Sequence, residues 1–297
     1  MRNDRATRRM LVATGIALVL AATAPARAQE EAAEDEGPNR GRISLSLTND
    51  FTNVYFFRGI MQERDGFIWQ PYVDVGLTLW EDEDAPINSV TLGMGIWSSF
   101  HSKKTLAGDS GPSNLYETDY YPSLTLGLPG NFETSFIYYV YTGPNGSFDT
   151  VQEMTILLSY DDSDLLGRWA MGPTLSFAAE LDRTSFGDER GTFIGLGVEP
   201  TIWASESEDL PLTVTFPMEI GLSVDNYYEE PGRSNSNFGY VSWGLSVGSD
   251  VPFIPAEYGT WNVSVTGRGF YLNNALARAN DDDRWYPQVV GSIGVSY

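Results

Sequence analysis

Apolar and polar residues alternate along most of the chain after residue 42. The clearest stretch runs from Leu212 to Asp225, where every even position is apolar and the odd positions are mostly small, polar or charged. Because successive side chains of a β-strand point to opposite faces, this period of two predicts a two-faced strand of about 14 residues. Strands of soluble sheets usually have only about five or six residues. The pattern therefore favours a sheet that separates two solvents.

Clusters of Gly, Pro, Asn and Asp interrupt the alternation and mark turns. They divide residues 43–297 into twelve predicted strands, at 43–59, 67–80, 88–101, 115–128, 132–142, 150–160, 167–182, 191–204, 210–225, 238–250, 259–273 and 284–297. An even number of strands returns the C-terminus to the side of the N-terminus, as bacterial outer-membrane barrels require. The predicted fold class is all-β, an antiparallel transmembrane β-barrel of about 12 strands with porin-like architecture.

A secreted soluble barrel or sandwich would show the same alternation, with its apolar face as the core. Two features favour a membrane barrel. The polar faces carry Thr, Ser, Gly and Asn with scattered charges, whereas a water-facing strand normally carries many Lys and Glu. Aromatic residues cluster near predicted strand ends, where the interfacial girdles of a barrel lie, at Tyr55, Phe56, Phe57, Phe67, Trp69, Trp80, Trp97, Phe100, Trp203, Tyr258, Trp261, Tyr271, Trp285, Tyr286 and Tyr297. A lipid-facing exterior explains both features, and closure of the barrel pairs the backbone groups that lipid cannot satisfy.

Residues 1–28 have the features of a secretory signal peptide. Arginines precede an apolar run, Leu11–Ala22, and Ala26-Arg27-Ala28 offers small residues where a signal peptidase cleaves. The run is shorter than the roughly 20 residues that a membrane-spanning helix needs. Residues 29–42 are acidic and almost free of apolar side chains, which predicts a disordered tail in front of the outer-membrane β-barrel of residues 43–297.

Composition and charge narrow the classes of function. The chain has 297 residues, with 40 acidic against 18 basic side chains and a formal charge of -22. Removal of residues 1–28 takes away five arginines and one aspartate and moves that charge to -26. A charge of this sign repels phosphate groups, so nucleic-acid binding is excluded. The lack of cysteine excludes disulfides and thiolate metal sites, and the single histidine leaves little for metal binding, so we expect no cofactor and no metal.

Three segments resemble a known family. The stretch from Ser46-Leu47-Thr48 through Tyr55-Phe56-Phe57-Arg58-Gly59-Ile60, followed by Gln70, looks like the N-terminal signature of the TorF family of proteobacterial outer-membrane porins. Glu117-Thr118-Asp119-Tyr120-Tyr121 is similar to an acidic-aromatic segment in the middle of that family. The closing segment 285–297 looks like the terminal strand that the barrel-assembly machinery recognises, with Val295 and Tyr297 as the assembly signal. The resemblance implies a porin in the outer membrane of a Gram-negative bacterium.

If the apolar faces contact lipid, the polar faces line the lumen. The expected pore-lining residues are eight acids and three arginines, namely Asp50, Asp74, Glu117, Asp119, Glu153, Glu180, Glu199, Glu219, Arg58, Arg168 and Arg268. Buried charges must be hydrated or paired, so the excess of carboxylates predicts a water-filled interior that attracts cations. The predicted function is a porin for passive diffusion of small hydrophilic solutes or ions, with a preference for cations.

A lipid-modifying barrel enzyme is an alternative function. Serine hydrolysis needs a histidine base beside the nucleophile, and His101 is the single histidine, with Ser98, Ser99 and Ser102 near it in sequence. The plainer interpretation is a solvated histidine at the edge of a loop. We therefore expect no enzymatic activity.

A third alternative is a non-conducting barrel that anchors surface loops, although the predicted outer loops are short. The acidic runs Glu81–Asp84, Asp161–Asp164 and Asp281–Asp283 lack the spacing of an EF-hand calcium loop and predict solvated turns. Of the three runs, only Asp281–Asp283 falls on the predicted outer side, where lipopolysaccharide lies. The expected partners are outer-membrane lipids and lipopolysaccharide, the barrel-assembly machinery, and small hydrophilic solutes or cations.

Overall fold

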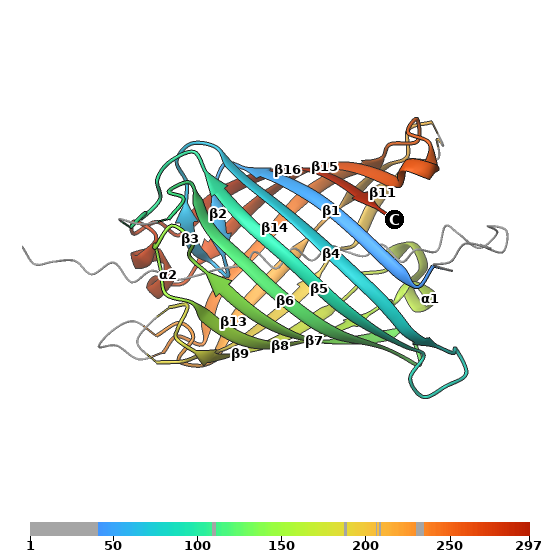
Figure 1. The fold of residues 1–297 in the computed structure, drawn as a ribbon, viewed down its shortest axis with the longest axis horizontal. Coiled ribbons are helices and arrows are strands. Elements are labelled where there is room, and N and C mark those ends of the chain that lie inside the picture. Colours follow the sequence, from blue (N-terminus) through green and yellow to red (C-terminus); the bar gives the residue numbers. More distant parts are fainter. Residues whose placement is uncertain (1–40, 109–110, 187–188, 206, 208, 230–234) are drawn as a thin grey trace, which may run out of the picture.

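The computed structural model describes residues 41–108, 111–186, 189–205, 207, 209–229 and 235–297 (Figure 1). Among these residues, fourteen strand segments form one antiparallel sheet that closes into a barrel. They are β1 (Ile43–Thr52), β4 (Ile68–Glu81), β5 (Ser89–His101), β6 (Leu115–Leu128), β7 (Phe132–Thr142), β8 (Val151–Tyr160), β9 (Thr174–Asp182), β10 (Thr192–Val198), β11 (Thr201–Ala204), β12 (Leu212–Thr215), β13 (Met218–Asp225), β14 (Phe238–Asp250), β15 (Thr260–Leu272) and β16 (Trp285–Ser296).

The barrel closes because its first and last strands pair with each other. Asp50 of β1 lies opposite Gln70 of β4 on one side and Ser292 of β16 on the other. β10 and β11 form one crossing that breaks at Pro200, and β12 and β13 form another that breaks at Pro217. Proline lacks the N–H group that the ladder uses, so both breaks fall where pairing is weakest. The wall therefore has 12 crossings, and the predicted fold class is confirmed.

Most predicted strands match the observed crossings to within a few residues, but two were wrong at one end. The predicted strand 43–59 ends at Thr52, because residues 55–63 fold into the barrel as a separate hairpin. The predicted strand 167–182 begins only at Thr174, because residues 163–169 form α1 (Ser163–Leu166) and η1 (Gly167–Trp169).

Large apolar side chains cover the outside of the wall. Along β5, Leu92, Met94 and Ile96 are 46%, 43% and 38% exposed, while the intervening Gly93 and Gly95 lie on the inner face. The same outward exposure recurs around the barrel, at Leu47, Val75, Leu77, Leu124, Phe136, Met154, Ile156, Leu175, Phe177, Leu196, Ile220, Leu245, Val247, Val263, Val265, Val289 and Ile293. Water would oppose so continuous an apolar belt, whereas a bilayer favours it, so the closed sheet is a transmembrane barrel.

The lumen differs between its two ends. We name the end where β1 leads into the hairpin the hairpin end (left in Figure 1), and the end with Ile43 and the C-terminus the terminal end (right in Figure 1). Toward the terminal end, the inner face carries short, half-buried residues, among them Thr91, Gly93, Ser123, Thr125 and Gly127. Toward the hairpin end, the lumen holds the hydrophobic core, which is largely aromatic and includes Tyr55, Phe57, Trp97, Tyr116, Tyr141, Phe193, Tyr227, Tyr228 and Tyr240.

Short helices lie at the two ends of the barrel. At the hairpin end, α2 (Asn274–Ala279) begins at Asn273, whose side chain accepts a hydrogen bond from the backbone N–H of Leu276 at 2.7 Å. At the terminal end lie α1, η1 and η2 (Ala256–Tyr258). Within the described part of the chain, every helix is too short or too polar to cross a bilayer.

Candidate functional site

The central feature of the lumen is a hairpin made of β2 (Tyr55–Phe57) and β3 (Ile60–Glu63). It forms its own two-stranded sheet and is not hydrogen-bonded into the barrel ladder. Its turn is Arg58-Gly59, with φ of 44° and 82°, and two-residue hairpin turns favour such positive values. A Cβ atom at Gly59 would lie 2.8 Å from Leu276 Cδ1, so both the backbone conformation and the packing require glycine.

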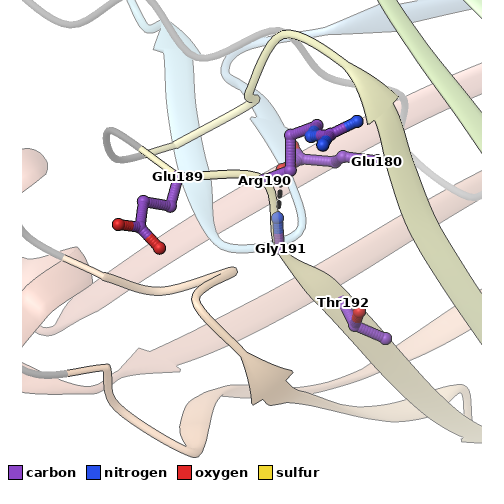
Figure 2. A pocket seen from close by; sticks show the side chains of 5 residues that line it. All are labelled: Glu180, Glu189, Arg190, Gly191 and Thr192. Carbon is purple, nitrogen blue, oxygen red and sulfur yellow. Dashed lines mark hydrogen bonds between the residues drawn. The ribbon is translucent and has the colours of Figure 1, made fainter.

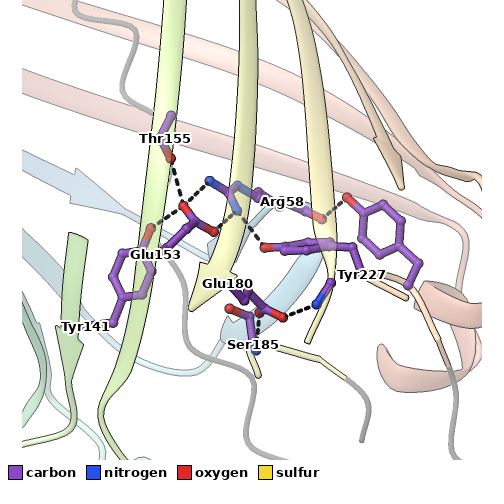
Figure 3. Close-up of polar contacts among 9 residues, drawn as sticks. Arg58, Tyr141, Glu153, Thr155, Glu180, Ser185 and Tyr227 are labelled. Atoms are coloured by element: carbon purple, nitrogen blue, oxygen red, sulfur yellow. Dashed lines mark hydrogen bonds and ion pairs between the residues drawn. The ribbon is translucent and has the colours of Figure 1, made fainter. Parts of the chain in front are cut away.

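The side chain of Arg58 points from the hairpin toward the barrel wall, where it pairs with Glu153 of β8 (Figure 3). Arg58 Nη1 lies 2.6 Å from Glu153 Oε2, and Nη2 lies 2.8 Å from Oε1, which is a bidentate pair. Nη1 also donates to the hydroxyl oxygen of Tyr227 at 2.9 Å. The Arg58 guanidinium carbon lies 4.3 Å from the centre of the Phe193 ring and 5.3 Å from that of Tyr227. We name these four residues, Arg58, Glu153, Phe193 and Tyr227, the arginine cage.

Further contacts fix the carboxylate of the cage. Tyr141 donates its hydroxyl to Glu153 Oε1 at 2.9 Å, and Thr155 donates to the same oxygen at 2.9 Å. The side chains of Arg58 and Glu153 are 3% and 0% exposed, so both charges are removed from water. Burial also raises the pKa of the Tyr227 hydroxyl above its ordinary value, which keeps that group protonated.

Loops at the hairpin end of the barrel form hydrogen bonds with the turn and with β3. Asn280 donates its side-chain N–H to the Gly59 carbonyl at 2.7 Å and accepts from the Met61 backbone N–H at 2.9 Å. Tyr228 donates its hydroxyl to the Arg58 carbonyl at 3.0 Å. The turn and β3 are therefore bound to segments more than 150 residues away in sequence.

The wall also contacts the sides of the hairpin. Tyr55 donates its hydroxyl to Glu117 Oε2 at 3.0 Å, and Tyr116 donates to Gln62 Oε1 at 2.6 Å. Gln288 of β16 donates to the Val54 carbonyl at 2.9 Å. Since Tyr55, Phe57 and Tyr116 are at most 1% exposed, side chains fill the lumen at this level.

The predicted pore-lining residues divide into two groups with different surroundings. Glu117, Asp119 and Glu153 are 0% exposed beside the hairpin, and Asp50 is 5% exposed. Glu199, Glu219 and Arg268 line one small cavity with Ser242, nearer the terminal end. There, Glu219 accepts from the Tyr240 hydroxyl at 2.8 Å, and Glu199 accepts from Thr215 at 2.7 Å. Asp74 pairs in register with Gly95 on the inner face of β4 and β5.

Two of the three arginines that were predicted to line the pore do not lie on strands of the barrel wall. Arg58 is inside the lumen, but on the hairpin and not on the wall. Arg168 lies in η1 at the terminal end, is exposed, and places its guanidinium 4.8 Å from the Trp169 ring centre, so its assignment to the pore lining was wrong. The helix formed by residues 163–169 removes it from β9.

His101 is buried, and its interpretation as a solvated loop residue was wrong. It is 1% exposed, and its Nε2 lies 2.9 Å from the hydroxyl of Ser99, which is 0% exposed. Its Nδ1 lies 2.7 Å from the Thr105 hydroxyl, which in turn donates to Glu63 of the hairpin. The ring stacks on Tyr116 with the centres 4.6 Å apart. The Ser–His pair thus faces the packed lumen and connects β5 to the hairpin.

A cavity of about 530 Å³ opens beside β9 and β10 (Figure 2). It is lined by Glu180, Glu189, Arg190, Gly191 and Thr192. Glu180 accepts the backbone N–H groups of Gly191 at 2.7 Å and of Ser185 at 2.5 Å, which fixes the carboxylate at the edge of the cavity (Figures 2 and 3).

The described residues contain no group of three or more His, Cys, Asp or Glu placed to hold a metal ion. The acidic runs lie between strands of the wall or at a strand end, and Asp164 belongs to α1. The carboxylate of Asp281 pairs with Arg64 at 3.1 Å, and both side chains are more than half exposed. Asp162 instead binds backbone N–H groups of Met171 and Gly172, at 2.9 Å and 3.0 Å.

Sequence reasoning missed Tyr227, Tyr228, Phe193 and Asn280, which complete the contacts of the hairpin. Three of them lie outside the strands, in loops without a repeating pattern. One signal was available: Tyr55, Phe56 and Phe57 are three consecutive aromatic residues that break the alternation. All three are at most 3% exposed, as expected of a segment that is buried on both faces.

No family model matches the chain, and the comparison with curated proteins finds no match. Among solved structures, an outer-membrane channel from Pseudomonas putida F1 is similar, with 9% identity, a TM-score of 0.45, and coverage of 86% of this chain and 95% of that one. Outer membrane phospholipase A from Escherichia coli has 12% identity and a TM-score of 0.41, with 84% and 91% covered. LpxR from Salmonella typhimurium has 8% identity and a TM-score of 0.39, with 84% and 99% covered. The resemblance to the TorF family stays a prediction.

Proposed function

We propose that this protein is an outer-membrane channel for passive diffusion of small hydrophilic solutes or ions, with a preference for cations. The observation that carries the proposal is the excess of acidic over basic side chains in the lumen. The pair of Arg58 and Glu153 is neutral as a unit, which leaves Arg268 as the remaining predicted lumen arginine. Against it stand the carboxyl groups of Asp50, Asp74, Glu117, Asp119, Glu180, Glu199 and Glu219. Rings of acidic side chains favour cations in channels.

The outer membrane is the proposed location, because membrane barrels with an even number of strands and an apolar outer belt are a feature of that membrane. The Tyr55-Phe56-Phe57-Arg58-Gly59-Ile60 segment, which resembles the TorF family, supports the same assignment. Outer-membrane barrels of this kind keep both chain ends on the periplasmic side. The terminal end therefore faces the periplasm, and the hairpin end faces outward. Lipopolysaccharide and outer-membrane lipids would surround the wall. The barrel-assembly machinery would recognise Val295 and Tyr297 of the terminal strand.

The hairpin determines when the channel conducts. Short Gly, Ser and Thr residues line the terminal half of the lumen, but the hairpin and the aromatic side chains around it fill the other half. Since only side-chain contacts and no strand pairing join the hairpin to the barrel sheet, the hairpin can move without breaking the ladder of the wall. The structure is therefore the closed state of the proposed channel.

The test is reconstitution of the mature chain in planar bilayers. We expect discrete conductance steps, and a reversal potential in a salt gradient whose sign reports cation preference. A reversal potential of the opposite sign would contradict the cation preference. An electrically silent bilayer with correctly folded protein would instead favour a barrel that anchors loops.

We also propose that the barrel has no lipase activity. Ser99 and His101 are within hydrogen-bond distance, as serine hydrolysis requires, but both side chains point into the packed lumen. A lipid acyl ester reaches the outer surface of the wall, where neither group is exposed. Their contacts to Gln70, Thr105 and, through Thr105, to Glu63 support a structural role.

A further inference from the structure

We infer that Glu153, Phe193 and Tyr227 form a binding site for small solutes that carry a guanidinium group, and that Arg58 is the tethered occupant of this site in the closed state. The inference rests on the proposed function, because it names the class of cation that the channel recognises and the step at which the solute acts. A free guanidinium group that replaces Arg58 in the site would release the tip of the hairpin.

The shape of the site matches a planar guanidinium group. Glu153 presents both oxygens, at 2.6 Å and 2.8 Å from the two terminal nitrogens of Arg58. The Tyr227 hydroxyl accepts a further N–H at 2.9 Å, and the Phe193 ring covers the guanidinium carbon at 4.3 Å. A carboxylate that accepts two parallel hydrogen bonds, together with an aromatic face, favours a planar guanidinium group over a compact ammonium ion or a hydrated metal ion.

The three residues of the site belong to the wall and its loops, and not to the hairpin. Glu153 lies on β8, Phe193 on β10, and Tyr227 in the loop between β13 and β14. Tyr141 and Thr155 hold the Glu153 carboxylate through hydrogen bonds that do not involve Arg58. The site therefore keeps its geometry when the arginine is absent, as a preorganised site must.

A cavity at the hairpin end lies next to the site. The cavity lined by Glu180, Glu189 and Gly191 holds about 530 Å³, which is enough for a small solute. Its wall abuts the cage, since a Cβ atom at Gly191 would lie 2.3 Å from Tyr227 Cα. Glu180 and Glu189 outnumber Arg190 in the lining of this cavity, so its acidic side chains favour a cation beside the loop that carries Tyr227.

The test uses the full mature barrel in detergent micelles and measures binding of guanidinium chloride by calorimetry. Arg58→Ala empties the site, and we expect saturable binding at least about tenfold tighter than in the parent protein, where Arg58 occupies it. Arg58→Ala/Glu153→Gln is the matched control and should lose that binding by at least about tenfold. Urea, which is planar but neutral, and potassium chloride at equal ionic strength should not bind in either variant.

Two results would overturn the inference: Arg58→Ala that binds guanidinium no better than the parent, or a double variant that binds it as well as Arg58→Ala. Retained heat-modifiable electrophoretic mobility shows that each variant is folded. If Arg58→Ala fails to fold, Arg58→Gln keeps the length of the side chain while releasing the carboxylate, and the same comparison applies.

Binding and conductance separate this inference from the proposed function. Guanidinium binding by a variant that never conducts would support the site and contradict the channel. Openings of the parent channel that guanidinium leaves unchanged, together with absent binding by Arg58→Ala, would support the channel and contradict the site. We expect binding by Arg58→Ala and more frequent openings of the parent, because guanidinium that replaces Arg58 releases the hairpin.

Discussion

The side chain of Asn280 donates to the backbone carbonyl of Gly59 at 2.7 Å, which joins two residues that lie 221 positions apart in the chain. The same side chain accepts from the Met61 backbone N–H at 2.9 Å, so one amide binds both the turn and β3. Asn280 is 0% exposed and follows α2, which lies at the hairpin end. The last segment before β16 thus closes the barrel over a hairpin that begins directly after β1.

Replacement of Asn280 by alanine should loosen the hairpin. Two buried hydrogen bonds are lost and their backbone partners are left unpaired, at a cost of about 1–3 kcal/mol. We expect more frequent channel openings in planar bilayers and a lower urea midpoint of unfolding. Asn274→Ala, at an exposed position of the same region, is the control and should behave like the parent. Unchanged gating in Asn280→Ala would contradict the role of this contact.

Glu153→Gln should destabilise the closed barrel more than loss of the whole ion pair does. The single change leaves the Arg58 charge buried without its carboxylate, and breaking a buried pair in this way costs about 3–5 kcal/mol. Arg58→Met/Glu153→Gln removes both charges and places an apolar chain among the rings, so most of the stability should return. Urea unfolding of the parent, both single variants and the double variant measures the coupling.

The control for this comparison is Glu133→Gln, at an exposed position of β7 toward the terminal end. It should change the unfolding midpoint little. If the effects of the Arg58 and Glu153 changes simply add, the two side chains are not coupled and the ion pair does not hold the hairpin.

Neutral substitutions in the lumen should reduce cation preference. Asp74→Asn together with Glu219→Gln removes up to two negative charges from the path while keeping side-chain size, so the cation-to-anion permeability ratio should fall. Reversal potentials in a potassium chloride gradient measure the ratio, and the effect should be larger in dilute salt, where screening is weaker. Asp82→Asn, in the exposed turn between β4 and β5, is the control. An equal fall of the permeability ratio in Asp82→Asn would show that exposed turns at the end of the barrel, and not the lumen, determine the selectivity.

His101→Ala should leave phospholipid turnover at the background level of the parent and should weaken the hairpin. The ring connects Ser99 to Thr105 and, through it, to Glu63, so its loss leaves buried hydroxyl groups with fewer partners, at about 1–3 kcal/mol. The assay follows fatty-acid release from labelled phospholipid alongside urea unfolding. Ser98→Ala, on the same strand, is the control. Lipid hydrolysis that disappears only in His101→Ala would establish an enzyme.

The wall of the barrel could be predicted because each crossing separates lipid from the lumen. That difference in solvent imposes a period of two, as at Leu92, Met94 and Ile96 on β5, and a local pattern suffices to detect it. The acidic lumen followed from the same alternation, since residues such as Asp74 and Glu219 fall on the inner face. Prolines 200 and 217 interrupt strands that the pattern treats as continuous, because the pattern counts side chains and not N–H donors.

The sequence by itself determined the twelve crossings, the apolar exterior and the position of acidic side chains such as Asp74 and Glu219 on the inner face. Only the tertiary structure decided that residues 55–63 leave the wall and fill the lumen, since the break in the alternation at residues 55–57 indicates burial but not the place of the segment in the fold. The partner of Arg58 likewise could not be predicted from the sequence, because Glu153 lies 95 residues away and contacts Arg58 only after the barrel has closed. Long-range pairing of buried charges depends on which strands become neighbours across the lumen, and that is a property of the closed sheet.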